Sequence, residues 1–131
     1  MAGLTKEQLA KLKRELQHRY LKLQKEVRSE LGSSSDQRHI SLASTLNDVG
    51  DNSVVDMLMD LDATIIDRQV HEMRKIEISL NNLLGNNFGN CIDCSEKIGF
   101  DRLMAFPTAQ RCITCQNRHE KIYAHESNPT L

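Results

Sequence analysis

Four cysteines, grouped in two pairs, constrain the fold of this chain more than any other feature. Cys91 and Cys94 form one Cys-x-x-Cys pair, Cys112 and Cys115 form the other, and seventeen residues separate the two pairs. That separation falls inside the gap of about 15–20 residues that is typical of four-cysteine zinc sites. Four thiolates complete a tetrahedral Zn²⁺ shell and leave no position open for a substrate. We therefore predict one structural Zn²⁺ whose binding supplies folding energy.

The cysteine pairs have an alternative interpretation, a redox dithiol in a thiol oxidoreductase. Such an enzyme would need cysteines that are partly free of metal. The sequence shows no Ser/His/Asp pattern and no glycine-rich phosphate loop, so we predict that the protein is not an enzyme. His119 and His125 could each replace a zinc ligand, but we expect both to be exposed on a closing helix. Beside the metal we expect a small core, contributed by Ile98, Phe100, Leu103 and Phe106. We also expect Gly89 and Gly99 to supply turn conformations that other residues resist, and a short helix that starts at Gln116.

The composition and the first residues of the chain indicate the cellular compartment in which we expect the protein. The chain has 131 residues and starts with MAGLTKEQLAKLKREL, which lacks the apolar centre of a secretory signal. No apolar run reaches the length of about 18 residues needed to cross a membrane. Because no export signal is seen, we expect a cytoplasmic protein with no membrane partner. Thiols stay reduced in the cytosol, so the four cysteines point to a metal rather than to disulfides. A net charge of −1 does not favour sequence-independent binding to a polyanion.

An apolar seam at steps of three and four residues predicts a long first helix. Thr5 and Gln8 are spaced as a capping box at its start. The segment Gly32–Asp36 interrupts the seam, and helical character resumes from Arg38 to Leu46, so we expect a break or a strained turn near Gly32. The seam consists of Leu9, Leu12, Leu16, Leu23, Val27 and Leu31, with Tyr20 filling its one gap.

A second seam predicts one helix from about Ser53 to Leu84, a stretch without Gly or Pro. Such a helix would be about 45 Å long. Ser53 followed by Asp56 resembles a capping box, Asp62 intrudes on the seam, and Gly85 is a natural stop. The seam consists of Val55, Leu58, Ile65, Met73, Ile76, Leu80 and Leu83.

Two long helices with narrow apolar stripes predict a mostly α fold built on an antiparallel hairpin, or coiled coil. We assign residues 1–87 to this hairpin, with its turn near 46–53, and residues 88–131 to a zinc module with a short C-terminal helix. We expect the hairpin to project as a rod; the alternative is a compact bundle in which a further helix packs on the pair. Net charge is +4 over residues 1–31 and −6 over residues 32–67. The acidic tip suits a basic or metal-bearing partner; the alternative is that Asp48, Asp51 and Asp56 only form the turn and the helix caps, where Asp is common.

The stretch FGNCIDCSEKIGFDRLMAFPTAQRCITCQ, from Phe88 to Gln116, resembles the C-terminal zinc finger of the DksA/TraR family of bacterial transcription regulators. A long predicted helix leads into it, as in that family. The preceding turn, Asp48-Val-Gly-Asp51-Asn-Ser53, is similar to the family's Asp-x-x-Asp-x-Ala tip motif, with Ser53 in place of the alanine.

This resemblance implies a monomer that binds bacterial RNA polymerase without contacting specific DNA. The coiled coil would enter the secondary channel, and Asp48 and Asp51 would be carboxylates near the active centre that alter promoter complexes, often together with the alarmone ppGpp. Two alternatives stay open. One is a zinc-ribbon module that binds nucleic acid or protein, although five Lys/Arg balance five Asp/Glu from Cys91 to Leu131. The other is a transcript-cleavage factor that uses the same channel.

Overall fold

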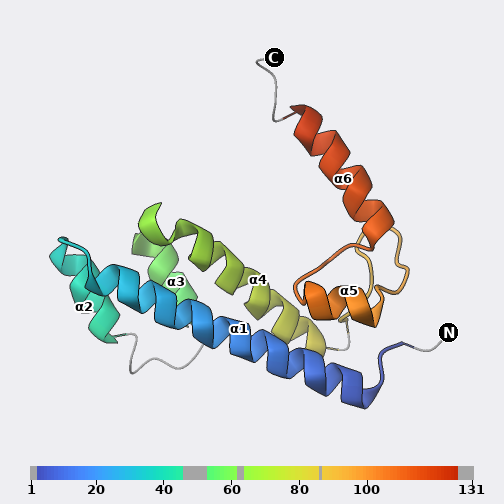
Figure 1. The fold of residues 1–131 in the computed structure, drawn as a ribbon, viewed down its shortest axis with the longest axis horizontal. Helices are drawn as coiled ribbons and strands as arrows, with labels where there is room; N and C mark the ends of the chain where they lie inside the picture. The colour runs from blue at the N-terminus through green and yellow to red at the C-terminus, as the bar shows by residue number, and fades with distance from the viewer. Residues whose placement is uncertain (1–2, 46–52, 62–63, 86, 127–131) are drawn as a thin grey trace.

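The structure is a computed structural model that describes residues 3–45, 53–61, 64–85 and 87–126. These residues are mostly helical, as predicted (Figure 1). Among them, no helix is both long and apolar enough to cross a membrane. The elements in chain order are α1 (Lys6–Gly32), α2 (Gln37–Thr45), α3 (Ser53–Leu61), the 3₁₀ turn η1 (Thr64–Ile66), α4 (Asp67–Leu84), α5 (Phe100–Ala105) and α6 (Ile113–Glu126).

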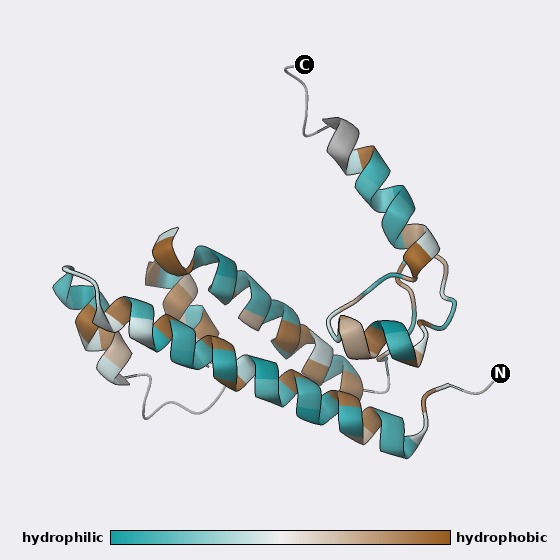
Figure 2. Cartoon of the chain, viewed as in Figure 1, coloured by the Kyte–Doolittle hydropathy of each residue, from teal (hydrophilic) through white to brown (hydrophobic). Residues whose placement is uncertain are grey.

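The stem of the molecule is an antiparallel pair formed by α1 and α4, which lie side by side in Figure 1. The predicted capping box starts α1. The Gln8 backbone N–H donates to Thr5 Oγ1 over 3.1 Å, and the Thr5 N–H donates to Gln8 Oε1 over 3.0 Å. Figure 2 shows a narrow apolar stripe along a largely hydrophilic helix, and this stripe is the predicted seam. Its fully buried members are Leu12, Leu16, Val27 and Leu31.

The second arm differs from the single helix predicted for it. Helix α3 ends at Leu61, η1 makes one 3₁₀ turn, and α4 begins at Asp67. This break decides which isoleucine is buried: Ile66 is 1% exposed, whereas Ile65, the predicted seam residue, is 48% exposed. The first arm also breaks after Gly32, which was one of the two outcomes expected there. As predicted, α4 ends just before Gly85.

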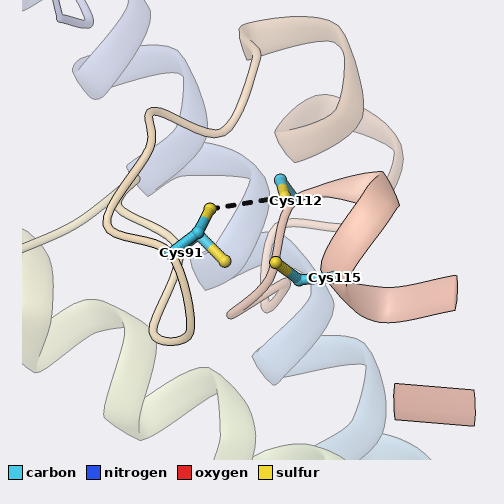
Figure 3. A group of neighbouring side chains, drawn as sticks. Cys91, Cys112 and Cys115 are labelled. Atoms are coloured by element: carbon cyan, nitrogen blue, oxygen red, sulfur yellow. Dashed lines mark hydrogen bonds between the residues drawn. The ribbon is translucent and has the colours of Figure 1, made fainter. Parts of the chain in front are cut away.

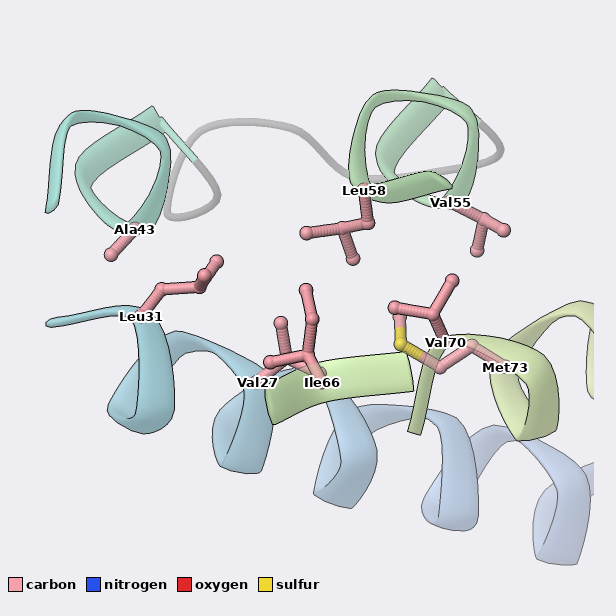
Figure 4. Close-up of a cluster of buried hydrophobic side chains, with 8 residues drawn as sticks. All are labelled: Val27, Leu31, Ala43, Val55, Leu58, Ile66, Val70 and Met73. Atoms are coloured by element: carbon pink, nitrogen blue, oxygen red, sulfur yellow. The ribbon is translucent and has the colours of Figure 1, made fainter. Parts of the chain in front are cut away.

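Helices α2 and α3 fold back on the stem, and together they replace the distal half of the predicted rod. Helix α2 packs on α1 and α3 packs on α4, while α2 and α3 do not adjoin each other in the part of the chain that is described. Figure 4 shows their side chains pointing down onto those of the stem. Burial of apolar surface is the main favourable term in the free energy of folding. When α2 and α3 fold back, they cover apolar side chains of the stem that the α1–α4 contact alone leaves open. The buried cluster consists of Val27, Leu31, Ala43, Val55, Leu58, Ile66, Val70 and Met73.

A polar network ties α1, α3 and α4 together. The carboxylate of Glu77, only 6% exposed, accepts a hydrogen bond from Tyr20 Oη at 3.0 Å and another from Arg74 Nη1 at 3.2 Å. Arg74 Nη2 also donates to Asp56 Oδ1 of α3 over 2.5 Å, and this hydrogen bond raises the pKa of Arg74. A buried carboxylate is tolerated only when it is paired and hydrogen-bonded in this way.

Replacing Tyr20 by phenylalanine is expected to lower the free energy of unfolding by about 1.5–3 kcal/mol, because a hydrogen bond to a buried charged group is lost. Urea unfolding followed by circular dichroism measures the change. Tyr123→Phe is the matched control, since Tyr123 is 54% exposed and its substitution should change stability by less than about 0.5 kcal/mol. Equal losses in the two variants would show that the Tyr20–Glu77 contact contributes nothing specific.

Candidate metal centre

The first cysteine pair lies on a tight turn with two residues in the left-handed region of the backbone. These are Gly89, with φ of 89°, and Ser95, with φ of 66°. The Cys91 N–H donates to the Glu96 carbonyl over 2.8 Å, and the Ser95 N–H donates back to the Cys91 carbonyl over 3.0 Å. This double contact closes the turn and leaves Cys91 and Cys94 on one side of it.

Of the two glycines expected to supply unusual turn conformations, one does so. Gly89 has a positive φ, and a Cβ there would also meet Leu4 Cδ1 at 3.2 Å. Gly99 has φ of −65° and ψ of 149°, an extended conformation open to any residue. The prediction for Gly99 was therefore wrong. Ser95, which the sequence did not single out, adopts the second left-handed conformation instead.

The second cysteine pair is carried by the start of α6. This helix was expected from Gln116 but begins at Ile113, so Cys112 immediately precedes it and Cys115 lies in its first turn. The Gln116 N–H donates to the Cys112 carbonyl over 2.8 Å. A helical turn places residues three apart on one face, and it therefore directs both sulfurs the same way.

Two contacts hold the cysteine turns against each other. The Ile92 N–H, next to Cys91, donates to the Gln110 carbonyl over 2.9 Å. Arg111 Nε, next to Cys112, donates to Asp93 Oδ2 over 2.8 Å. Each contact joins a residue of the first turn to a residue just before the second pair, so the protein itself positions the four thiols relative to one another.

The four sulfur atoms converge on one point. They all lie within 4.8 Å of one another, and the Cys94 and Cys112 Sγ atoms are 3.8 Å apart. Four thiolates at tetrahedral angles and Zn–S bonds of about 2.3 Å would place their sulfurs about 3.8 Å apart. Cys91 and Cys115 are buried, and Figure 3 shows the labelled side chains pointing toward a common centre. The donor set and its spacing fit Zn²⁺.

The thiols differ in acidity because their surroundings differ. Burial raises the pKa of Cys91, but backbone N–H groups of Cys94, Cys112 and Asp93 outweigh it and bring the value to about 6. The pKa of Cys115 rises to about 12, through its side-chain contact with Cys112 and through burial. Thiolates are the zinc ligands, so metal binding displaces protons and weakens as the pH falls.

The zinc module packs directly on the N-terminal end of α1. Leu12 of α1 joins a buried cluster with Ile98 and Leu103, and Leu4 and Phe100 cover it partly. Two of the cysteines, Cys91 and Cys115, belong to the same cluster. The role of α1 in closing the metal site was not predicted, because the pairing of residues about 80 positions apart leaves no local signal in the sequence.

Helix α5 was not predicted either, and it changes which residues of this segment are buried. Leu103 points into the core as expected, but Phe106, expected there too, is 60% exposed and lies under the Arg102 guanidinium at 5.7 Å. Pro107 is fully buried in its place. The spacing of Phe100 and Leu103, three residues apart after Gly99, was the available signal for this short helix.

The remaining predicted residues lie outside the sulfur cluster or outside the described chain. His119 is half-buried and is not part of the cluster. Its ring packs against that of Tyr123, with centroids 4.3 Å apart and the ring planes tilted by 40°. The His125 side chain, and the tip residues Asp48 and Asp51, fall outside the described residues. Ser53 is the first residue of α3.

Comparison with known proteins places the metal-binding segment in a described family. Residues 86–121 match the family described as "Prokaryotic dksA/traR C4-type zinc finger". The match contains all four cysteines, and with the sulfur geometry it assigns one structural Zn²⁺ to the protein.

Two curated relatives carry the name RNA polymerase-binding transcription factor DksA. The protein of Haemophilus influenzae is 46% identical over 54 residues, which cover 41% of this chain and 37% of the relative. That of Buchnera aphidicola is 37% identical over 78 residues, which cover 60% of this chain and 52% of the relative. The chain thus matches between about a third and a half of each relative's length.

A solved structure matches over most of the fold. Transcription factor DksA2 from Pseudomonas aeruginosa aligns with a TM-score of 0.60 over 92% of this chain and 88% of that one. The sequence identity is 23%, so this likeness concerns the fold alone.

Proposed function

We propose that the chain is a member of the DksA/TraR family of C4-type zinc-finger proteins and a transcription regulator that binds bacterial RNA polymerase. The observation that carries the proposal is the zinc finger itself, matched over residues 86–121 and seated at the base of a helical hairpin. Its relatives are named as transcription factors rather than enzymes. We infer that the protein acts by binding and by shifting the populations of polymerase states, rather than by chemistry of its own.

In this proposal the two parts of the chain have separate tasks. Residues 88–131 form the zinc module, in which Cys91, Cys94, Cys112 and Cys115 bind the metal. Residues 1–87 form the hairpin that enters the secondary channel of the polymerase. A pair of helices suits a narrow channel, since each helix with its side chains is about 10–12 Å wide.

The acidic tip would be the part that acts. Asp48 and Asp51, with Ser53 beside them, would approach the active centre of the polymerase. Carboxylates there can accept hydrogen bonds from basic side chains or from water bound to a catalytic Mg²⁺. The charge of −6 over residues 32–67 supports a basic or metal-bearing partner. We further propose a cytoplasmic monomer without sequence-specific DNA contacts, which acts in concert with ppGpp at the polymerase interface.

The test is transcription in vitro from a ribosomal-RNA-type promoter, with and without ppGpp, comparing wild type with the variant Asp48→Asn/Asp51→Asn. We expect the variant to lose the regulatory effect while its affinity for polymerase stays within about twofold, because the tip acts after the hairpin has bound. The matched control is Asp60→Asn/Asp67→Asn, which removes the same charge from two exposed residues and should keep the effect.

Other outcomes separate the alternatives. Loss of affinity in step with loss of effect would make the tip a binding anchor and contradict its proposed role. A mobility shift of DNA by the protein alone would favour the zinc-ribbon nucleic-acid binder. Shortening of the transcript in a stalled complex would favour the cleavage factor.

A further inference from the structure

The outer face of α1 carries a single line of basic side chains, here called the basic row. Its members are exposed and recur at steps of three and four residues. None of them takes part in an ion pair with any other residue that the structure describes. Glu15, which lies within the same stretch of α1, is bonded instead to Arg19 Nε at 2.7 Å. The row consists of Lys11, Arg14, His18, Lys22 and Lys25.

The basic row is straight and lies opposite the buried side of α1. At 100° per residue, its centre is roughly 170° from the centre of the fully buried seam residues of this helix. From Lys11 to Lys25 the row is about 21 Å long, with about one basic side chain for each turn of 5.4 Å. Helix α1 packs on α2, α4, α5 and η1 through its other sides, so the row is left to the solvent.

The stability of α1 does not account for the basic row. Like charges three or four residues apart destabilise a helix, and the row contains two such pairs of fixed charges, one of them Lys22 with Lys25. The outer face of α4 differs, because Lys75 there pairs with Glu72 at 3.2 Å. A row that weakens its own helix and stays unneutralised in the free protein is available to an anionic partner.

The surroundings of the row decide which kind of anionic partner fits. A lipid surface would need an apolar helix face to insert, and that face of α1 is buried. A nucleic acid that followed the row would run on toward the stretch 32–67, whose net charge of −6 repels it. Tyr20, the aromatic residue of α1 that could stack on bases, is bonded to Glu77 instead. These observations favour an acidic protein surface.

We propose that the basic row docks an acidic α-helix of the polymerase, one that presents Asp or Glu at steps of three and four residues over about four turns. Both rows then repeat once per turn, so each basic side chain can meet a carboxylate along the whole contact. Exposed pairs of this kind speed the encounter and fix the orientation of the partner more than they add affinity. The choice of polymerase rests on the proposed function; the presence of the row on α1 does not.

The first test compares the affinity of the zinc-loaded protein for core polymerase with that of Arg14→Gln/Lys22→Gln/Lys25→Gln. We expect the variant to bind about 5- to 50-fold more weakly at about 0.1 M salt, mainly through slower association, because three exposed ion pairs are lost. The difference should fall below about twofold at about 0.5 M salt, where the Debye length is only about 4 Å. Circular dichroism should show no loss of helix, since the substitutions remove repulsion within α1.

The matched control is Lys6→Gln/Lys13→Gln/Lys97→Gln, which removes the same charge from exposed positions outside the row and should bind as the wild type does. Equal weakening of the two variants would show that only net charge matters, and would overturn the row as a docking surface. Wild-type affinity in the row variant would overturn it too, while the proposed function would stand. If the wild type itself did not bind polymerase, the proposed function and this assignment would both be overturned.

A photo-crosslink identifies the occupant of the row directly. Leu21 is 58% exposed and lies beside the row, three residues after His18 and four before Lys25. With a benzophenone amino acid at this position, we expect a crosslink to a polymerase helix that is rich in Asp and Glu. A crosslink to nucleic acid in a promoter complex, or to a neutral or basic segment of polymerase, would contradict the proposal.

Discussion

Removal of zinc by a strong chelator is expected to unfold the module from Asn87 to Glu126 while α1 and α4 keep part of their helical structure. Structural zinc sites contribute about 10–16 kcal/mol of apparent binding energy, which is folding energy for a module of this size. Here the metal offsets the mutual repulsion of four thiolates, whose sulfur atoms lie within 4.8 Å of one another. Circular dichroism should show a loss of helix from α5 and α6, and amide NMR signals of the module should collapse to random-coil positions.

The variant Cys112→Ser should reproduce this loss in the presence of zinc, because a hydroxyl is a poor zinc ligand and one corner of the tetrahedron is removed. Thr114→Ser is the matched control, since Thr114 is exposed, lies between the same two cysteines and should retain one zinc per chain. Metal content and thermal melting measure both variants. Identical melting before and after chelation would falsify a structural role for the metal.

The substitution Leu12→Ala is expected to lower the free energy of unfolding by about 2–5 kcal/mol, because it opens a cavity where α1 meets the zinc module. Leu12 is fully buried in the cluster that also contains Cys91, Leu103 and Cys115. The cavity lies against the metal site, so we also expect faster transfer of zinc to a chelator. Urea unfolding and the rate of zinc release measure the two effects.

Leu21→Ala is the control for this variant, because Leu21 lies on the same helix but is 58% exposed. Its effect on stability should stay below about 0.5 kcal/mol, and its rate of zinc release should match that of the wild type. If Leu12→Ala destabilised α1 and left zinc release unchanged, the module would fold independently of the hairpin, and the shared cluster would have no energetic role.

The metal site was predictable because its information is local. The spacing of Cys91, Cys94, Cys112 and Cys115 is enough to predict a four-thiolate zinc site, and the structure brings their sulfurs together. The start of α1 and the end of α4 were predictable for the same reason, since a cap or a glycine acts on its own neighbours. The tip residues Asp48 and Asp51 remain a prediction.

Tertiary contacts decided the rest. A period of three and four residues marks an apolar face but does not say what covers it. The stretch from Ser53 to Leu84 has the pattern of one helix, yet burying Ile66 together with Val55 and Leu58 required a break that no glycine or proline announces. The sequence by itself thus determined a zinc-binding helical protein with two apolar seams. Only the tertiary structure decided that α2 and α3 fold back on α1 and α4. In this arrangement the apolar stripe of each stem helix is covered by a second helix as well as by its partner in the pair, so more apolar surface is buried.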